Sequence, residues 1–232
     1  MERRSSILIL ACSLFLLLIS GCGRNSPTKQ ERTDTVSGSA PTANPQSEDT
    51  RPVIVAFGDS LTAGVAGRSY PDILQDLMDQ NGFRYRIDNQ GVSGDTTTDG
   101  LARIDNVMTV HPSLVILEFG GNDGLRGIPV ESTRKNLEEM IERLRKANLP
   151  IVLLGITLPP NYGPEYVKSF TTMYPELAKK YRLRFLPFLL IHTYRDFTLM
   201  QPDGIHPNGE GNKIVAKDVF ELVRPLLRES PK

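Results

Sequence analysis

Cysteine is scarce in this chain, which has two among its 232 residues, Cys12 and Cys22. Cys12 lies in an N-terminal apolar segment that we expect to be removed, so the mature chain would keep Cys22 alone. A single cysteine forms no internal disulfide. It also leaves no thiol inside a folded domain for zinc binding or for nucleophilic catalysis.

Neither sign of charge is in excess, because 27 Lys and Arg residues balance 27 Asp and Glu residues. A balanced chain suggests neither a basic surface for nucleic acid nor a field that would collect acidic substrates. We therefore expect no nucleic-acid partner. The sequence also lacks the glycine-rich phosphate-binding loop, the His-Glu-x-x-His zinc motif and the dinucleotide glycine pattern. We expect no cofactor and no metal ion.

Long hydrophobic runs are missing as well. The main apolar segment, residues 7–19, has about 13 residues, whereas a membrane-spanning helix needs about 20. A basic start at Arg3 and Arg4 and small residues after the segment are typical of a secretory signal peptide. Ile19-Ser20-Gly21-Cys22 resembles the lipobox of bacterial lipoproteins, which implies cleavage before Cys22 and lipidation of that cysteine. An ordinary export signal with a chance cysteine is the alternative.

The composition divides the chain into three parts. Residues 1–21 are the expected signal peptide, and residues 22–51 are the lipidated cysteine followed by a tether. Residues 25–51 are rich in Ser, Thr, Pro, Gln, Asn and Gly, which bury too little apolar surface to fold. About 28 such residues span roughly 30 Å. Residues 52–232 are numerous enough for one domain with a substantial core, which we expect to be monomeric.

The same features predict where the protein is located. A lipid on Cys22 would hold the domain in a bacterial cell envelope, facing the periplasm or the exterior. Gly23 follows the cysteine, where an aspartate would favour retention in the inner membrane under enteric-type sorting. Under that kind of sorting, the expected location is the outer membrane.

Apolar, β-branched runs alternate with helical patterns throughout the domain. The alternation predicts a three-layer α/β/α sandwich with a mostly parallel five-stranded sheet. The expected strands are residues 53–57, 85–88, 114–119, 151–156 and 185–188, and the expected helices are residues 71–81, 98–108, 130–148, 164–181 and 209–227. In such open sheets ligands bind beyond the carboxyl ends of the strands.

Ser60 stands directly after the first expected strand, where it is either a nucleophile or a helix cap. A serine nucleophile needs a base, usually a histidine oriented by a carboxylate. His111 is expected in a loop, and His192, among apolar neighbours, is more simply structural. His206 has Asp203 three residues before it, a spacing that can place the carboxylate against one ring nitrogen. Taken alone this spacing is a weak signal, because Asp-Gly turns are common.

Two glycine-bearing loops at the same expected edge could supply hydrogen-bond donors to an oxyanion. They are Gly91-Val92-Ser93-Gly94-Asp95 and Gly120-Gly121-Asn122-Asp123. Backbone amides of small residues and asparagine side chains are the usual donors. Helix caps and ordinary turns are the alternative interpretation.

Four segments in order resemble the blocks of GDSL/SGNH hydrolases, namely Gly58-Asp59-Ser60-Leu61, the two glycine-bearing loops, and Asp203-Gly204-Ile205-His206-Pro207. The resemblance is closer to the bacterial thioesterase I, lysophospholipase L1 and arylesterase branch. It implies the flavodoxin-like SGNH fold, with Ser60 as nucleophile, His206 as general base and Asp203 as its orienting carboxylate. It also implies an oxyanion hole made by the backbone amides of Ser60 and Gly94 and the side chain of Asn122.

The resemblance further implies hydrolysis of aryl esters, lysophospholipids and possibly acyl thioesters through an acyl-enzyme. Leu158, Pro159, Asn161 and Tyr162, in a loop after the fourth expected strand, are the candidate substrate contacts. Two alternatives remain open. One is a carbohydrate O-deacetylase acting on envelope sugars, and the other is a non-catalytic envelope lipoprotein that binds lipid or sugar. The sequence gives no role for the segment 192–201.

Overall fold

The computed structural model describes residues 49–65 and 67–228. The expected signal peptide, Cys22 and most of the expected tether lie outside these residues, so those predictions stay predictions. Within the described part, no helix is both long enough and apolar enough to cross a membrane.

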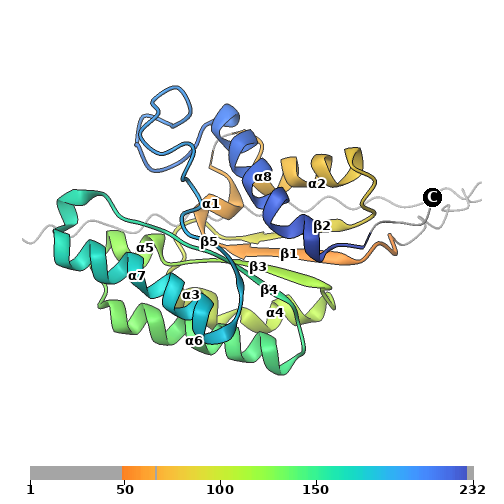
Figure 1. Ribbon diagram of the computed structural model, residues 1–232, viewed down its shortest axis with the longest axis horizontal. Helices are drawn as coiled ribbons and strands as arrows, with labels where there is room; N and C mark the ends of the chain where they lie inside the picture. The colour runs from red at the N-terminus through yellow and green to blue at the C-terminus, as the bar shows by residue number, and fades with distance from the viewer. Residues whose placement is uncertain (1–48, 66, 229–232) are drawn as a thin grey trace, which may run out of the picture. The chain divides into compact units, whose positions relative to one another are not determined.

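One sheet of five parallel strands forms the middle layer, with the order β2-β1-β3-β4-β5. The strands β1, β3 and β4 are mainly apolar and are buried throughout, because helices cover both faces of the sheet. The predicted three-layer sandwich is confirmed (Figure 1). The strands are β1 Val53–Gly58, β2 Arg86–Gly91, β3 Leu114–Glu118, β4 Ile151–Leu154 and β5 Arg184–Leu186.

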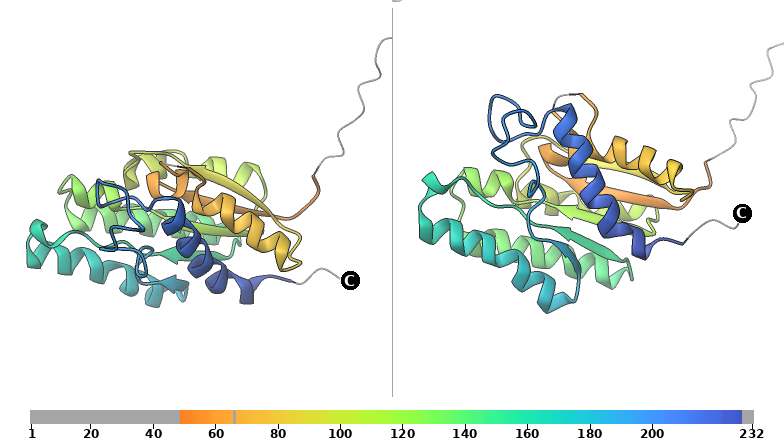
Figure 2. Two further views of the ribbon diagram at one scale, coloured as in Figure 1. Left: turned by 90° about the horizontal axis from the view of Figure 1, so that it is seen from above. Right: turned by 45° about the horizontal axis from the view of Figure 1, so that its top comes forward.

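Two helices, α2 and α8, pack together over one face of the sheet, and α3 to α7 lie on the other face (Figures 1 and 2). The short α1 begins directly after β1. The helices are α1 Ser60–Ala63, α2 Tyr70–Gln80, α3 Thr97–Ala102, α4 Ile104–Thr109, α5 Gly121–Leu125, α6 Val130–Lys146, α7 Pro164–Tyr181 and α8 Gly209–Val223. Two single turns of 3-10 helix, η1 Pro160–Tyr162 and η2 Arg224–Leu226, complete the elements.

The apolar stripe of α6 illustrates how the core is made. Leu137, Met140, Ile141 and Leu144 recur at helical spacing and all are fully buried. Complete burial of one such side chain stabilises the fold by about 1.5–3 kcal/mol relative to exposure. The opposite side of α6 carries Glu139 and Arg143, which pair four residues apart on the surface.

Several element bounds differ from the sequence-based expectation. The helix expected at residues 98–108 is two helices, α3 and α4, which meet at the non-helical Arg103. The second strand begins one residue later than expected and continues to Gly91, because Asn89 and Gln90 pair with β1 despite their polarity. Both β4 and β5 are shorter than expected.

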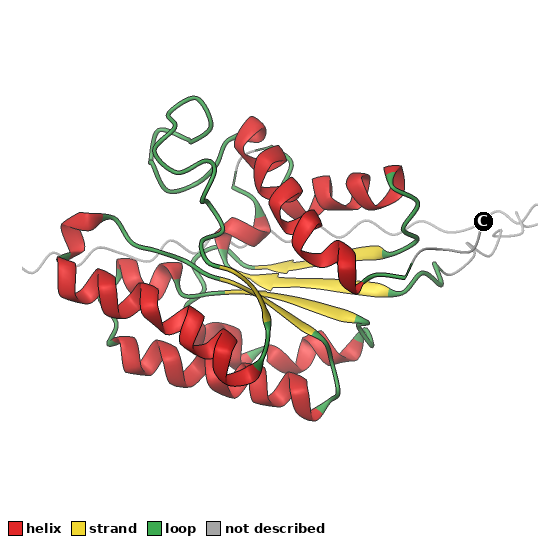
Figure 3. Ribbon diagram, in the orientation of Figure 1, coloured by secondary structure: helices red, strands yellow, loops and turns green. Residues whose placement is uncertain are grey.

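The two edges of the sheet have different uses. The loops at the carboxyl edge carry the glycine-bearing segments, and a long loop between β5 and α8 projects there (Figure 3). At the amino edge, Tyr85 holds both ends of the described chain. Its carbonyl accepts a hydrogen bond from the Arg51 guanidinium at 3.3 Å, and its hydroxyl accepts one from the backbone N–H of Arg228 at 3.1 Å.

Candidate active site

Ser60 is the first residue of α1, immediately after β1. Asp59, and not Ser60, caps this helix, because Asp59 Oδ1 accepts the Leu61 N–H at 3.0 Å. The serine hydroxyl is therefore free for another partner. That partner is Nε2 of His206, 2.8 Å from Ser60 Oγ.

His206 lies in a turn that Asp203 organises. Asp203 Oδ1 accepts the backbone N–H groups of Ile205 at 2.9 Å and of His206 at 3.0 Å. Asp203 Oδ2 lies 2.7 Å from His206 Nδ1. The imidazole therefore bridges Asp203 and Ser60, so the structure brings together these three sequence-predicted residues.

The charge of Asp203 is stabilised by the same contacts. Partial burial opposes ionisation, but the hydrogen bonds from His206 and Ile205 outweigh it and lower the pKa of this carboxyl. Asp203 is therefore an anion at neutral pH and can stabilise a positive charge on His206 during a reaction.

Two segments bring hydrogen-bond donors to the neighbourhood of Ser60. Gly94 has a φ of +88°, a conformation that favours glycine, and its amide donates to no acceptor among the described residues. The Gly94 carbonyl accepts from Arg126 at 2.8 Å. The Asn122 side-chain amide donates to the Asp95 carbonyl at 3.0 Å and, at a longer 3.3 Å, to Asp59 Oδ2. The longer bond is the one that a substrate oxyanion could replace.

Arg103 joins the loops around Ser60, a role that the sequence did not indicate. Its guanidinium donates to the carbonyls of Gly58 at 2.9 Å and Gln90 at 2.7 Å, and pairs with Asp95 at 2.7 Å. It also lies over the ring of Phe57, 4.5 Å from the ring centre. One side chain thus fixes the ends of β1 and β2 relative to the loop that carries Gly94.

A pair of buried carboxyl groups lies next to the Ser60 turn. Asp59 and Glu118 are both buried, and no cation pairs with either of them within the described part of the chain. Burial raises the pKa of Asp59 to about 6, against the lowering effect of the Leu61 N–H. Burial and the Asp59 charge raise the pKa of Glu118 well above its usual range. Glu118 is the only charged residue in an otherwise apolar strand, and that was its one signal in the sequence.

An apolar pocket of about 50 Å³ is bordered by Leu61, the residue after Ser60, and by Ile205, the residue before His206. Leu158 and Pro159, both predicted substrate contacts, line it together with Leu61, Gly121, Leu125, Ile156, Thr157, Phe188, Leu190, Tyr194, Gly204 and Ile205. Five of these residues also line a wider outer groove of about 350 Å³, so the two spaces are continuous. Nothing in the sequence pattern indicated that Phe188, Leu190 and Tyr194 would line the pocket.

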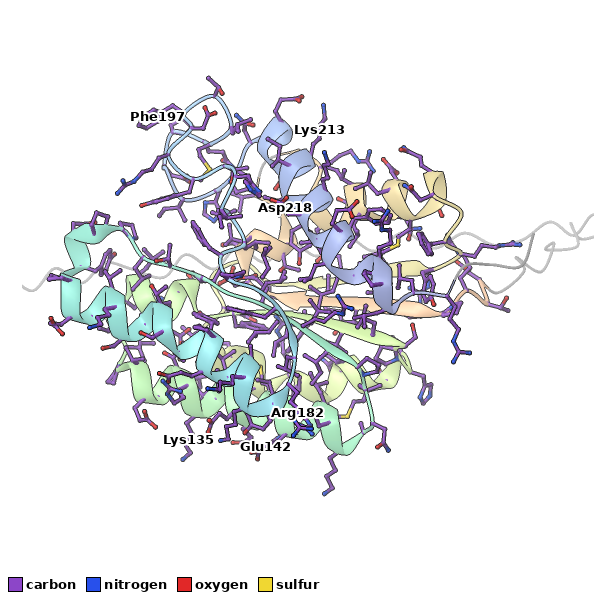
Figure 4. All side chains as sticks on the ribbon, in the orientation of Figure 1. Lys135, Glu142, Arg182, Phe197, Lys213 and Asp218 are labelled. Atoms are coloured by element: carbon purple, nitrogen blue, oxygen red, sulfur yellow. The ribbon has the colours of Figure 1, made fainter. Side chains whose placement is uncertain are left out.

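The outer groove contains the other two predicted substrate contacts, Asn161 and Tyr162. Its remaining wall is the loop between β5 and α8, whose tip carries Phe197 (Figure 4). Phe197 is 88% exposed, the highest value among the large hydrophobic side chains described. The segment 192–201, which had no role in the sequence analysis, therefore forms one wall of this groove.

The other two histidines lie apart from Ser60. His192 pairs with Asp218 on α8 at 2.8 Å between Nδ1 and Oδ2, and His111 lies in a loop with a φ of 48°. Among residues 49–65 and 67–228, no three His, Cys, Asp or Glu side chains are placed so that they could hold a metal ion.

Comparison with known proteins finds relatives of this chain among ester hydrolases. Residues 56–214 match the GDSL-like Lipase/Acylhydrolase family. The arylesterase of Vibrio mimicus is 38% identical over 178 residues, which are 75% of this chain and 89% of the relative. The thioesterase 1/protease 1/lysophospholipase L1 of Escherichia coli K12 is 36% identical over 178 residues, 75% of this chain and 84% of the relative. The crystal structure of TesA matches with a TM-score of 0.72 and 35% identity, covering 75% of this chain and 99% of that one.

Proposed function

The chain belongs to the GDSL-like lipase/acylhydrolase family, and from this membership we propose that Ser60 is the nucleophile of a carboxylic ester hydrolase. The chain is an enzyme of the esterase class, as its relatives are. The observation that carries the nucleophile assignment is the 2.8 Å contact between Ser60 Oγ and His206 Nε2. No other histidine of the described chain contacts a serine hydroxyl.

The reaction follows from this geometry. Ser60 Oγ attacks the acyl carbonyl carbon and passes its proton to His206 Nε2. Asp203 keeps the imidazole in place through Nδ1 and stabilises the imidazolium. The oxyanion accepts hydrogen bonds from the amides of Ser60 and Gly94 and from the Asn122 side chain. The tetrahedral intermediate expels the alcohol or thiol, which takes the proton from Nε2, and leaves an acyl group on Ser60.

Deacylation repeats these steps with water. His206 Nε2 removes a proton from the water as its oxygen attacks the acyl carbon, and the proton then goes to Ser60 Oγ as the acid leaves. The same residues thus act in acylation and in deacylation, and His206 returns to its neutral form at the end of each.

The two connected spaces favour an ester with an apolar acyl group. The inner pocket is lined almost wholly by apolar side chains, so we assign it to the acyl chain. The outer groove contains Tyr162, Tyr194, Arg195 and Phe197, and we assign it to the alcohol half of the ester. In aryl esters and lysophospholipids, the acyl chain would occupy the inner pocket and the alcohol the outer groove. The acyl chain of a thioester would occupy the same inner pocket.

A series of p-nitrophenyl esters tests this proposal. We expect hydrolysis of medium-chain esters, and mass spectrometry after acid quenching should find the acyl group on the peptide that contains Ser60. Faster release of acetate from acetylated sugars, without turnover of longer chains, would instead establish the O-deacetylase alternative. Binding of either ligand without any turnover would establish the non-catalytic one.

We also propose that the mature protein is a lipoprotein of the bacterial cell envelope. The support is the sequence Ile19-Ser20-Gly21-Cys22 after a short apolar segment, followed by a polar stretch suited to a tether. An envelope location favours lysophospholipids or small esters over acyl-CoA, because acyl-CoA is a cytoplasmic pool.

Replacement of Cys22 by serine tests the anchor. We expect the Cys22→Ser protein to lose fatty-acid labelling and to leave the membrane fraction, because one hydroxyl cannot carry the thioether-linked lipid. Fractionation and metabolic labelling measure both effects. Activity on a water-soluble ester should stay at the wild-type level. A Cys22→Ser protein that remains lipid-labelled in the membrane fraction would contradict the proposal.

A further inference from the structure

The two oxygens of Glu118 have different surroundings. Oε2 accepts two hydrogen bonds, from the Asp59 N–H at 3.2 Å and from the Thr62 hydroxyl at 2.8 Å. The Thr62 hydroxyl in turn lies 3.3 Å from the hydroxyl of Tyr70, which can donate to it. Oε1 is fully buried and meets no donor among the described residues. Of the two carboxyl oxygens of Glu118, only Oε2 therefore accepts hydrogen bonds.

A buried carboxylate with an unpaired oxygen beside a second carboxylate is unfavourable, because burial and like charge both oppose ionisation. Glu118 and Asp59 form such a pair, and burial together with the Asp59 charge raises the pKa of Glu118. Asp59 has the better stabilisation, since it accepts from Leu61 and Asn122 and lies near His206. When the pair holds one proton, that proton is therefore bound to Glu118, and Asp59 is the carboxylate.

A nearby carboxylate gives the contrasting pattern. Asp123 is equally buried, but both of its oxygens face donors. Oδ2 accepts the Thr97 N–H at 2.8 Å, and Oδ1 accepts the hydroxyls of Thr97 at 2.5 Å and Thr133 at 3.2 Å. Donors on both oxygens suit an anion, whereas donors on one oxygen suit a neutral acid or an amide.

We propose that Glu118 is a neutral positioning residue that carries a proton on Oε1 and directs it toward Asp59. Asp59 then stays a carboxylate next to the nucleophile. Its Oδ1 keeps capping α1, which fixes Ser60, and its Oδ2 keeps accepting the hydrogen bond from the Asn122 amide. Sharing the Asp59 charge with the Glu118 proton also weakens the hold of Asp59 on Asn122, so the amide can transfer to the oxyanion.

The other titratable groups around the pair agree with this assignment. Burial raises the pKa values of Tyr70 and Tyr174, so both phenols are neutral. Arg103 is bound to Gly58, Gln90 and Asp95 and forms no ion pair with Glu118 in the described structure. No cation is therefore available to stabilise an ionised Glu118.

The pH dependence of kcat/KM in a Glu118→Gln variant tests the charge state. A carboxylate near His206 favours imidazolium, so removing a charge would move the acid limb of the profile to lower pH. Glutamine matches a neutral glutamic acid in shape and hydrogen bonding. We therefore expect kcat within about threefold of wild type and an unmoved acid limb. Asp59→Asn, which does remove a charge, should move the limb to lower pH and serves as the positive control.

A limb shift in Glu118→Gln comparable to that in Asp59→Asn would overturn the proposal, because it would show that Glu118 is an anion in the native enzyme. Asp123→Asn is the stability control. We expect it to lower the melting temperature below that of Glu118→Gln, since it removes a buried charge that three donors stabilise. Equal losses in the two variants would also count against a neutral Glu118.

An infrared measurement on the wild-type chain covers the case in which Glu118→Gln does not fold. At pH 8, protein labelled with ¹³C-glutamate should show the C=O stretch of a protonated carboxylic acid, shifted by the label. No such band would refute the proposal. The inference rests on the proposed ester hydrolysis only for its kinetic readout. A protein that hydrolyses no ester but shows the infrared band would contradict the proposed function and leave the neutral Glu118 supported.

Discussion

Replacing Ser60 by alanine should lower kcat for a medium-chain p-nitrophenyl ester by about 10⁶-fold, the scale seen when a serine hydrolase loses its nucleophile. In the described structure the Ser60 hydroxyl forms one hydrogen bond with a side chain, that of His206. The cap of α1 is Asp59, so it does not depend on Ser60. The fold therefore loses little, and the melting temperature and circular dichroism should match the wild type. Initial rates with high enzyme concentration measure the residual activity.

Ser113→Ala is the matched control for this change. Ser113 lies just before β3, at the amino edge of the sheet, and its hydroxyl donates to the Val53 carbonyl at 2.9 Å. This control should lose a hydrogen bond, worth about 1 kcal/mol of stability, and keep full activity. If Ser60→Ala kept one per cent of the wild-type kcat, the nucleophile would have to be another residue.

Asn122→Ala should lower kcat by about 10²–10³-fold with little change in KM, the loss expected for one oxyanion donor. In the resting structure both amide hydrogens of Asn122 have protein acceptors, Asp95 and Asp59. The role therefore requires the 3.3 Å bond to Asp59 to be exchanged for a bond to the oxyanion. Because that bond strengthens only as the carbonyl oxygen becomes charged, the loss should fall on kcat.

Asn136→Ala provides the comparison for Asn122→Ala. The Asn136 amide also donates two hydrogen bonds, both of 3.0 Å, to Thr97 and Thr98, but it stands on α6. It should cost similar stability and leave kcat unchanged. An Asn122→Ala enzyme with the wild-type kcat would remove Asn122 from the oxyanion hole and leave the backbone amides of Ser60 and Gly94 as the donors.

The sequence predicted the long, strongly patterned elements well and the short polar ones poorly. The bounds of α7 agree with the expectation, Pro164 to Tyr181, because Pro and Gly mark its start and apolar residues follow at helical spacing. The end of β2 was missed because Asn89 and Gln90 are strand residues only through pairing with β1. The break at Arg103 was missed for a similar reason, since its side chain binds groups distant in sequence.

The site was predictable to the extent that its residues occur in recognisable blocks. Ser60 and His206 are 146 residues apart, and no local pattern relates them. The two residues were related instead by the order of four glycine-bearing or aspartate-bearing blocks along the chain. Arg103, Glu118 and the pocket-lining Phe188 lie outside those blocks, and their contributions depend on burial and on partners across the sheet. Such dependence becomes visible only when the packing is known.

Both ends of the described chain bind Tyr85, at the edge of the sheet away from Ser60, so segments can be joined there at a distance from the nucleophile. A leader peptide, a lipid anchor, an affinity tag or a fusion partner joined at residue 49 or residue 228 begins at the amino edge of the sheet. None of the residues that line the two substrate spaces belongs to these ends of the described chain. The same domain can therefore serve in a secreted, an anchored or an immobilised enzyme, and its kinetic constants can be compared directly among those forms.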